Sequence, residues 1–167
     1  MSIISTRIQP CLWFDGQAKE AAQFYVDTFP NSRLGGISLY PEAGREHHGK
    51  APGSVMTVAF ELDGQAFLAL NGGPQFKFTE ALSLMVLCKT QEEIDHYWHA
   101  LSAGGDPDAQ VCGWLKDRYG LSWQITPANS LEMITCPDRT AVERYMSAMM
   151  SMKKLDLATL QAAFEGR

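Results

Sequence analysis

The sequence predicts an α+β fold made of two similar modules and a C-terminal helical extension. Three observations support this: an internal repeat, runs of strands without helices between them, and a change to helical patterns late in the chain. Strands that follow one another without crossover helices are not typical of a doubly wound parallel sheet. The modules are expected over residues 5–75 and 80–127, forming one paired unit over 5–127, and residues 128–167 form the extension.

The first module is expected to begin with an apolar strand that ends at Asp15-Gly16. A helix should follow, because Ala18, Ala21, Ala22 and Tyr25 recur at helical spacing. Two β-prone runs around Asp63-Gly64 predict a hairpin. In chain order the expected elements are a strand at 8–14, a helix at 17–29, a strand at 34–40, a polar loop at 42–52, and hairpin strands at 54–62 and 65–70.

The second module repeats this order after a shift of 73 residues. The shift places Glu20 on Glu93 and the aromatic pair Phe24-Tyr25 on Tyr97-Trp98. A strand at 82–88 and a helix at 91–103, capped by Thr90, are expected in this copy. In the extension, a stripe of Val142, Tyr145, Met146 and Met149 predicts one helix, and residues 156–164 predict another that opens on an aspartate cap.

A hairpin around Asp117-Arg118-Tyr119-Gly120 closes the second module, because Asp and Gly favour turns. After the turn, apolar residues alternate with polar ones, so the strand has two unlike faces. The apolar set is Leu121, Trp123 and Ile125, and the polar set is Ser122, Gln124 and Thr126. A turn at 117–120 predicts that Trp114 faces Trp123 and that Gly113 lies opposite Gln124. The segment alone also suits a strand with one solvated face.

Composition excludes several classes of partner. The 167 residues are 46% hydrophobic and carry a net charge of −5 without a basic cluster, so neither nucleic acid nor a membrane surface is expected as a partner. No apolar run is long enough to span a bilayer, and the first residues do not resemble a signal peptide. A cytoplasmic location is therefore expected. The four cysteines form no C-x-x-C pair and are interpreted as free thiols.

The histidines leave two interpretations open. His47 and His48 lie in the polar loop, where they could form a lid with a general base or metal ligand, or simply be solvated. The sequence does not decide whether they reach a cavity. His96 and His99 share a helix face with acidic neighbours, which favours a solvated face.

Four segments carry a resemblance to a known family: PCLWFDGQAKEAAQFYVDTFPNS, GSVMTVAFELDGQAFLALNGGPQFKF, CGWLKDRYGLSWQITP and AMMSMKKLDLATLQAAF. Together they resemble the PhnB-like, demethylubiquinone 3-methyltransferase-like branch of the vicinal oxygen chelate superfamily. That superfamily includes glyoxalases, bleomycin resistance proteins and extradiol dioxygenases. The resemblance implies two βαβββ modules with a cupped mixed sheet, and it implies a homodimer.

The resemblance also implies a divalent metal in the cup, with ligands at set strand positions. These positions fall on Pro10, Ser83 and Gln124, and the first hairpin offers Ala69 or Asn71. A stable site for Zn, Fe or Mn requires three or more imidazole, thiolate or carboxylate ligands. Neutral amide and hydroxyl oxygens leave the charge of the ion uncompensated, so neither a metal nor another cofactor is expected.

The methyltransferase in the family name can be tested against the sequence. A class-I methyltransferase would need a glycine-rich loop between a strand and the start of a helix. The glycine pairs Gly35-Gly36, Gly72-Gly73 and Gly104-Gly105 do not form such a loop. Binding of S-adenosylmethionine in that mode is therefore not expected.

The functional hypothesis is a metal-free protein that binds a small organic ligand in a mainly apolar cup. No pair of residues forms a convincing acid/base or nucleophile set, so no catalytic residue is assigned and enzymatic activity stays open. The alternatives are a metal-dependent lyase, isomerase or dioxygenase, or a methyltransferase. The expected ligand-binding residues are Gln124, Ser122, Thr126, Ser83, Asn71, Trp123 and Trp114.

Overall fold

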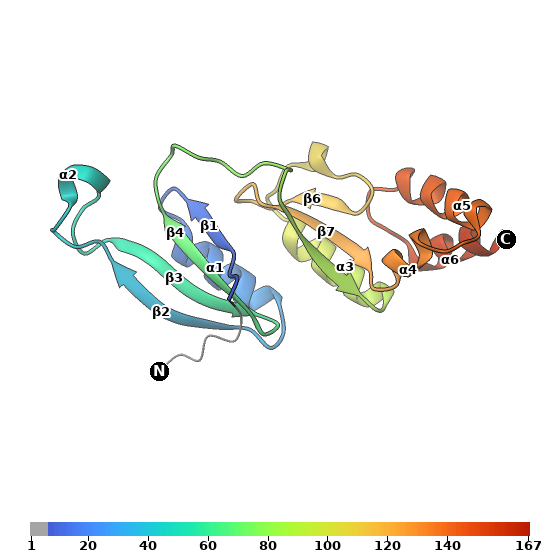
Figure 1. The fold of residues 1–167 in the computed structure, drawn as a ribbon, viewed down its shortest axis with the longest axis horizontal. Helices are drawn as coiled ribbons and strands as arrows, with labels where there is room; N and C mark the ends of the chain where they lie inside the picture. The colour runs from blue at the N-terminus through green and yellow to red at the C-terminus, as the bar shows by residue number, and fades with distance from the viewer. Residues whose placement is uncertain (1–6) are drawn as a thin grey trace. The chain divides into compact units, whose positions relative to one another are not determined.

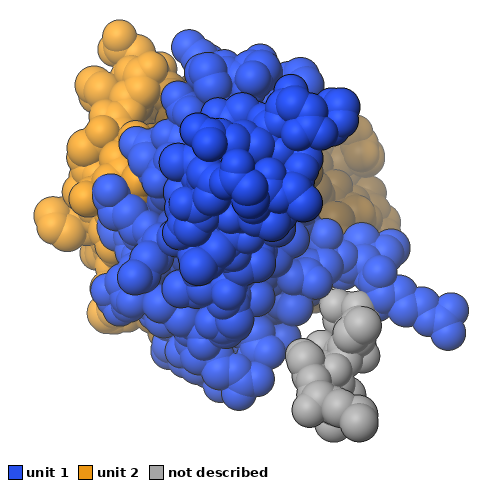
Figure 2. All heavy atoms as spheres, turned by 90° about the vertical axis from the view of Figure 1, so that its left-hand side faces the viewer, with its two compact units in different colours: residues 1–77 blue, residues 78–167 orange. Residues whose placement is uncertain are grey.

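The computed structural model describes residues 7–167, which divide into two compact units. One unit runs up to Lys77 and the other runs from Phe78 to the end of the chain. Figure 1 labels their helices and strands, and Figure 2 colours the two units. Each helix of the described residues is too short or too polar to cross a bilayer.

The first unit is a four-stranded sheet with a helix packed on one face. The sheet has the order β1-β4-β3-β2, in which β1 runs parallel to β4 and the other pairs are antiparallel. The inner face of α1 is fully buried through Ala18, Ala21, Ala22 and Tyr25. The elements are β1 (Cys11–Phe14), α1 (Ala18–Thr28), β2 (Arg33–Leu39), α2 (Arg45–His48), β3 (Val55–Leu62) and β4 (Gln65–Asn71).

The polar segment that the sequence predicts as a loop contains a short helix, α2. Gly44 and Gly49 flank it with positive φ, which glycine adopts readily, and Gly49 caps its C-terminal end. The His48 ring packs against Tyr40, with ring centroids 4.8 Å apart. His47 is exposed and contacts Glu46.

The second unit is a three-stranded sheet with helices. Its order is β5-β7-β6, in which β5 runs parallel to β7 and β6 runs antiparallel to it. Ile94 and Leu101 of α3 are fully buried. The elements are β5 (Ser83–Cys88), α3 (Gln91–Ser102), the 3₁₀ helix η1 (Pro107–Ala109), β6 (Trp114–Lys116), β7 (Ser122–Pro127), α4 (Ser130–Ile134), α5 (Arg139–Met150) and α6 (Leu157–Glu165).

The predicted repeat is visible in the two sheets. The helices α1 and α3 begin at Ala18 and Gln91, which are 73 residues apart. In both units the last strand pairs in parallel with the first. The second sheet has no counterpart of β2, because that part of the chain forms η1, which opens on Pro107. The predicted α+β class with C-terminal helices is confirmed, while residues 78–127 form a βαββ module instead of βαβββ.

The predicted register of the last hairpin is wrong by one residue. The Asp117 N–H donates to the Leu121 carbonyl at 3.0 Å, so three residues and not two form the loop. The last loop residue, Gly120, has φ +84°, which is typical of a three-residue hairpin loop. Trp114 therefore pairs with Gln124 instead of Trp123. A shift of one residue moves each side chain to the other face of the sheet. Trp114 therefore lies on the same face as Ser122, Gln124 and Thr126.

The C-terminal helices are joined to the second sheet. Tyr145, Leu155 and Leu160 form a buried cluster with several methionines around it. The side chain of Gln91, the first residue of α3, links this helix to the C-terminal extension. Its Oε1 accepts from the Leu157 N–H at 2.8 Å, and its Nε2 donates to the Leu155 carbonyl at 3.1 Å. The predicted cap of the last helix is confirmed, because Asp156 accepts from the N–H of Thr159 at 2.7 Å.

Candidate functional site

One face of the second sheet gathers polar side chains from three strands. In a parallel or antiparallel pair, residues directly opposite one another point to the same face. The pairs Ser83–Ser122, Met85–Gln124 and Leu87–Thr126 join β5 to β7. The pairs Trp114–Gln124 and Lys116–Ser122 join β6 to β7. We call this surface the polar face, defined by Ser83, Met85, Leu87, Trp114, Lys116, Ser122, Gln124 and Thr126.

Gln124 lies near the middle of the polar face and is hydrogen-bonded across it. Its amide Nε2 donates to the Ser83 Oγ at 2.8 Å. The bond fixes the orientation of the carboxamide, and within the described chain no hydrogen bond reaches the Gln124 Oε1. The half-buried amide therefore presents a carbonyl oxygen that can accept a hydrogen bond from a ligand.

A cavity of about 490 Å³ lies beside the polar face at β6. Ser122, one of its lining residues, is 1% exposed, and its Oγ has no hydrogen-bond partner within residues 7–167. An unsatisfied buried hydroxyl is unfavourable, so a ligand that reaches it gains a hydrogen bond that the protein alone does not make. The lining residues are Glu80, Asp108, Ala109, Val111, Cys112, Trp114, Leu115, Lys116 and Ser122.

An ion pair stands at this cavity. The Lys116 Nζ lies 2.5 Å from the Glu80 Oε1, and the lysine side chain is the more buried partner. The hydrogen bond from Lys116 lowers the pKa of the Glu80 carboxyl. The Glu80 carboxyl therefore stays ionised at neutral pH. Neither residue was predicted at the site, because Lys116 reaches this face only in the observed register and Glu80 comes from the segment before β5.

Trp123 lies on the opposite face, away from the other predicted residues. It is 2% exposed, and its indole N–H donates to the Asp117 Oδ2 at 2.8 Å. The other Asp117 oxygen accepts from the backbone N–H groups of Tyr119 and Leu121, at 2.8 and 3.1 Å. This buried carboxylate holds the hairpin loop and the indole together, which makes Trp123 a core residue.

Asn71 lies in the first unit, at the end of β4, and its side chain serves the fold. Its Oδ1 accepts from the N–H of Ala18 at 2.9 Å, where α1 begins. Its Nδ2 donates to the Val55 carbonyl at 3.1 Å. The N-cap residue Gln17 makes no side-chain cap hydrogen bond, so Asn71 satisfies a helix N–H that would otherwise lack a partner.

Replacing Asn71 by alanine is expected to lower the free energy of unfolding by about 2 kcal/mol, because the buried Ala18 N–H and the partly buried Val55 carbonyl lose their partner. Urea unfolding followed by circular dichroism measures this change. Gln17→Ala, at the exposed residue before α1 whose side chain makes no cap hydrogen bond, is the control and should change stability by less than about 0.5 kcal/mol. Equal effects of the two variants would show that Asn71 has no capping role.

The metal implied by the family resemblance can be compared with these residues. Ser83 and Gln124 are hydrogen-bonded to each other and supply only neutral oxygens, and the remaining position is Pro10. Within residues 7–167, no three His, Cys, Asp or Glu side chains come together as a metal-binding group. These side chains do not fit a divalent metal, because nothing at the aligned positions compensates its charge.

The chain is similar to a protein family and to solved structures. A family model described as 3-demethylubiquinone-9 3-methyltransferase matches residues 6–126. A PhnB protein from Bacillus cereus, described as a proposed 3-demethylubiquinone-9 3-methyltransferase, is 38% identical over 74% of this chain and 100% of that chain, with a TM-score of 0.62. Protein PA1353 from Pseudomonas aeruginosa shares the fold, with 20% identity, 74% and 98% coverage and a TM-score of 0.56. A search among curated proteins gave no match.

Proposed function

Because the chain belongs to the 3-demethylubiquinone-9 3-methyltransferase family, we propose that it binds a small organic molecule on the polar face of the second sheet. The observation that carries the proposal is the Gln124–Ser83 hydrogen bond beside a cavity with an unsatisfied Ser122 hydroxyl. A binding site is typically an apolar concavity with a few fixed polar groups. This face has that composition.

The surroundings favour a flat, largely apolar ligand that carries a hydrogen-bond donor. Met85 and Leu87 of β5 are 55% and 61% exposed on this face, and the half-buried Trp114 ring adds aromatic surface. The Gln124 Oε1 would accept a hydrogen bond from a hydroxyl or N–H of the ligand. The Ser122 hydroxyl can donate or accept, so it would bind the other polar end.

The proposal is limited to binding, without a metal and without a named reaction. The polar face and the cavity beside it contain an amide, hydroxyls and the Glu80–Lys116 ion pair, but no nucleophile bonded to a general base. Two measurements test the alternatives. Stoichiometric Zn, Mn or Fe in protein purified without chelator would favour a metal-dependent enzyme. Saturable binding of S-adenosylmethionine in calorimetry would favour a methyltransferase.

A thermal-shift screen of small hydrophobic acids, quinones and antibiotics tests the proposal directly. For a compound that binds, Gln124→Ala is expected to raise the Kd about five- to tenfold, because one hydrogen bond to the ligand is lost. Gln23→Ala, on the exposed face of α1, is the matched control and should leave the Kd unchanged. An unchanged Kd in Gln124→Ala for every compound found would place binding elsewhere.

A further inference from the structure

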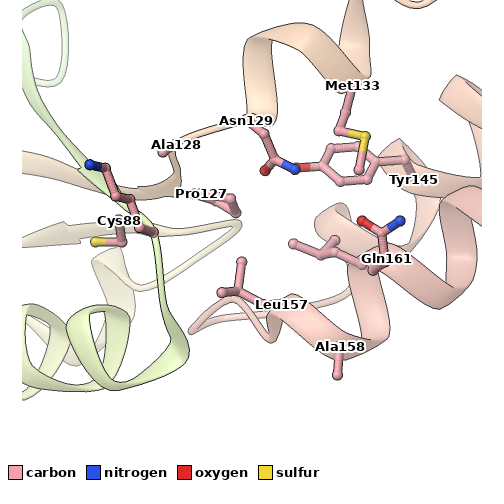
Figure 3. A pocket seen from close by; sticks show the side chains of 11 residues that line it. Cys88, Pro127, Ala128, Asn129, Met133, Tyr145, Leu157, Ala158 and Gln161 are labelled. Atoms are coloured by element: carbon pink, nitrogen blue, oxygen red, sulfur yellow. The ribbon is translucent and has the colours of Figure 1, made fainter.

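A second cavity, of about 600 Å³, lies where the ends of β5 and β7 meet the C-terminal helices (Figure 3). It is lined by residues of the second unit alone, and most of them follow residue 126, where the match to the family model ends. The lining residues are Cys88, Lys89, Pro127, Ala128, Asn129, Met133, Tyr145, Leu157, Ala158, Leu160 and Gln161. This cavity is separate from the cavity at β6, because the two share no residue.

The floor of the cavity is apolar. Tyr145 and Leu160 are 1% and 2% exposed, and Met133 packs against them. The Tyr145 hydroxyl already has a partner, because it donates to the Ser130 Oγ at 3.1 Å. The deeper part of the cavity therefore suits a hydrocarbon or aromatic body.

The wall of the cavity carries no net charge. Burial, together with the nearby Glu93 carboxylate, raises the pKa of the Cys88 thiol to about 12, and burial also raises the pKa of the Tyr145 hydroxyl. Lys89 is the one lining residue with a charged side chain, and its backbone N–H donates to the Glu93 carboxylate at 2.6 Å, which brings an opposite charge beside it. A charged ligand would lose its hydration here without gaining an uncompensated opposite charge. The cavity therefore favours an uncharged ligand.

Two carboxamides supply hydrogen-bonding groups at this space. Within residues 7–167, the Asn129 side chain makes no hydrogen bond, although it stands at the start of α4. The Gln161 Nε2 donates to the Glu165 Oε1 at 2.7 Å, which leaves the Gln161 Oε1 as an acceptor. Figure 3 shows Asn129, Tyr145 and Gln161 around one space, with Leu157 on its other side. A ligand hydroxyl suits these groups, because it can accept from an amide nitrogen and donate to an amide oxygen.

We propose that this cavity binds a small uncharged alcohol, with its hydrocarbon or aromatic body against Tyr145, Leu160 and Met133. The hydroxyl of the alcohol accepts a hydrogen bond from the Asn129 amide and donates one to the Gln161 Oε1. The methionine at the wall adapts to bodies of different shape, because its side chain is unbranched and flexible. The proposal is independent of ligand binding on the polar face, since it concerns different residues.

The probe is 2-phenylethanol, and calorimetry on the full chain is the measurement. Ethylbenzene is the analogue without the hydroxyl, and phenylacetate is the charged analogue. The alcohol is expected to bind with a Kd below about 1 mM, and phenylacetate about fivefold or more weakly than the alcohol. Asn129→Ala should weaken the alcohol about three- to fivefold, as the loss of one hydrogen bond does, and should leave ethylbenzene unchanged. Gln161→Trp, at an exposed helix position, should fill the space and weaken both uncharged compounds about tenfold or more.

Gln23→Ala and Gln23→Trp, on the exposed face of α1, are the matched controls and should not change the binding of either uncharged compound. The proposal is overturned if 2-phenylethanol does not bind, if phenylacetate binds as tightly as the alcohol, or if either Asn129→Ala or Gln161→Trp binds the alcohol as the unchanged chain does. Binding that survives in these two variants and is lost in Gln124→Ala would assign the alcohol to the polar face, which also overturns the proposal.

Discussion

Replacing Asp117 by alanine is expected to lower the free energy of unfolding by about 4 kcal/mol. Asp117 is 2% exposed and accepts hydrogen bonds from the backbone of Tyr119 and Leu121 and from the Trp123 indole. Alanine would leave these buried donors without an acceptor and would open a small cavity. Urea unfolding followed by tryptophan fluorescence measures the loss as a lower midpoint.

The milder variant Asp117→Asn separates the hydrogen bonds from simple packing. An asparagine oxygen can still accept from the two backbone N–H groups, but its amide N–H₂ then faces the Trp123 indole N–H. We expect about half of the alanine effect, near 2 kcal/mol. Asp108→Ala, at an exposed position, is the control and should stay within about 0.5 kcal/mol. If Asp117→Ala were as mild as this control, the carboxylate would not hold the hairpin.

The second large effect is expected for Gly105→Ala, at about 3 kcal/mol of lost stability. A Cβ at Gly105 would lie 2.0 Å from the Lys116 carbonyl oxygen, which is backbone of β6 and cannot rotate away. The chain before η1 would have to move, and with it the edge strand that carries Trp114 and Lys116. Urea unfolding measures the effect, and the cavity at β6 should lose ligand affinity in the same variant.

Gly36→Ala is the matched control for this prediction. Gly36 lies in β2, and a Cβ there would meet no atom within 4 Å. The substitution should change stability by less than about 0.5 kcal/mol, or raise it slightly by restricting the unfolded chain. Equal destabilisation by both substitutions would mean that the close contact at Lys116 is not what makes glycine necessary at position 105.

Much of the fold was predictable from local patterns. Helical spacing in 17–29 and 91–103, the Asp63-Gly64 hairpin and the shift of 73 residues all read directly from the sequence, and the structure confirms them. The PhnB-like assignment is confirmed by the family match and by 38% identity to the Bacillus cereus protein. The helices and the hairpin depend on residues that are near one another in the chain. The repeat and the family match depend on the pattern of whole segments.

The site was harder to predict, because it depends on distant contacts and on a single residue of register. Two- and three-residue loops are both compatible with Asp117–Gly120, and only the observed loop brings Trp114 and Lys116 beside Gln124 and Ser122. The sequence predicts Asn71 as a ligand residue, and nothing near it in the chain indicates that its Oδ1 accepts from the Ala18 N–H, 53 residues earlier. The bond between Ser83 and Gln124 joins positions that the family resemblance had already singled out.

The bridge from Gln91 to the C-terminal extension has a consequence for the order in which the chain folds during synthesis. Its hydrogen bonds join residues 64 and 66 positions apart, and the Cys112 N–H donates to the Met152 carbonyl at 2.7 Å. A ribosome releases residues 7–77 before residues 152–160, so the first unit can fold while the second unit still lacks these contacts. A stop codon after residue 126, where the match to the family model ends, would remove these partners of Gln91 and Cys112.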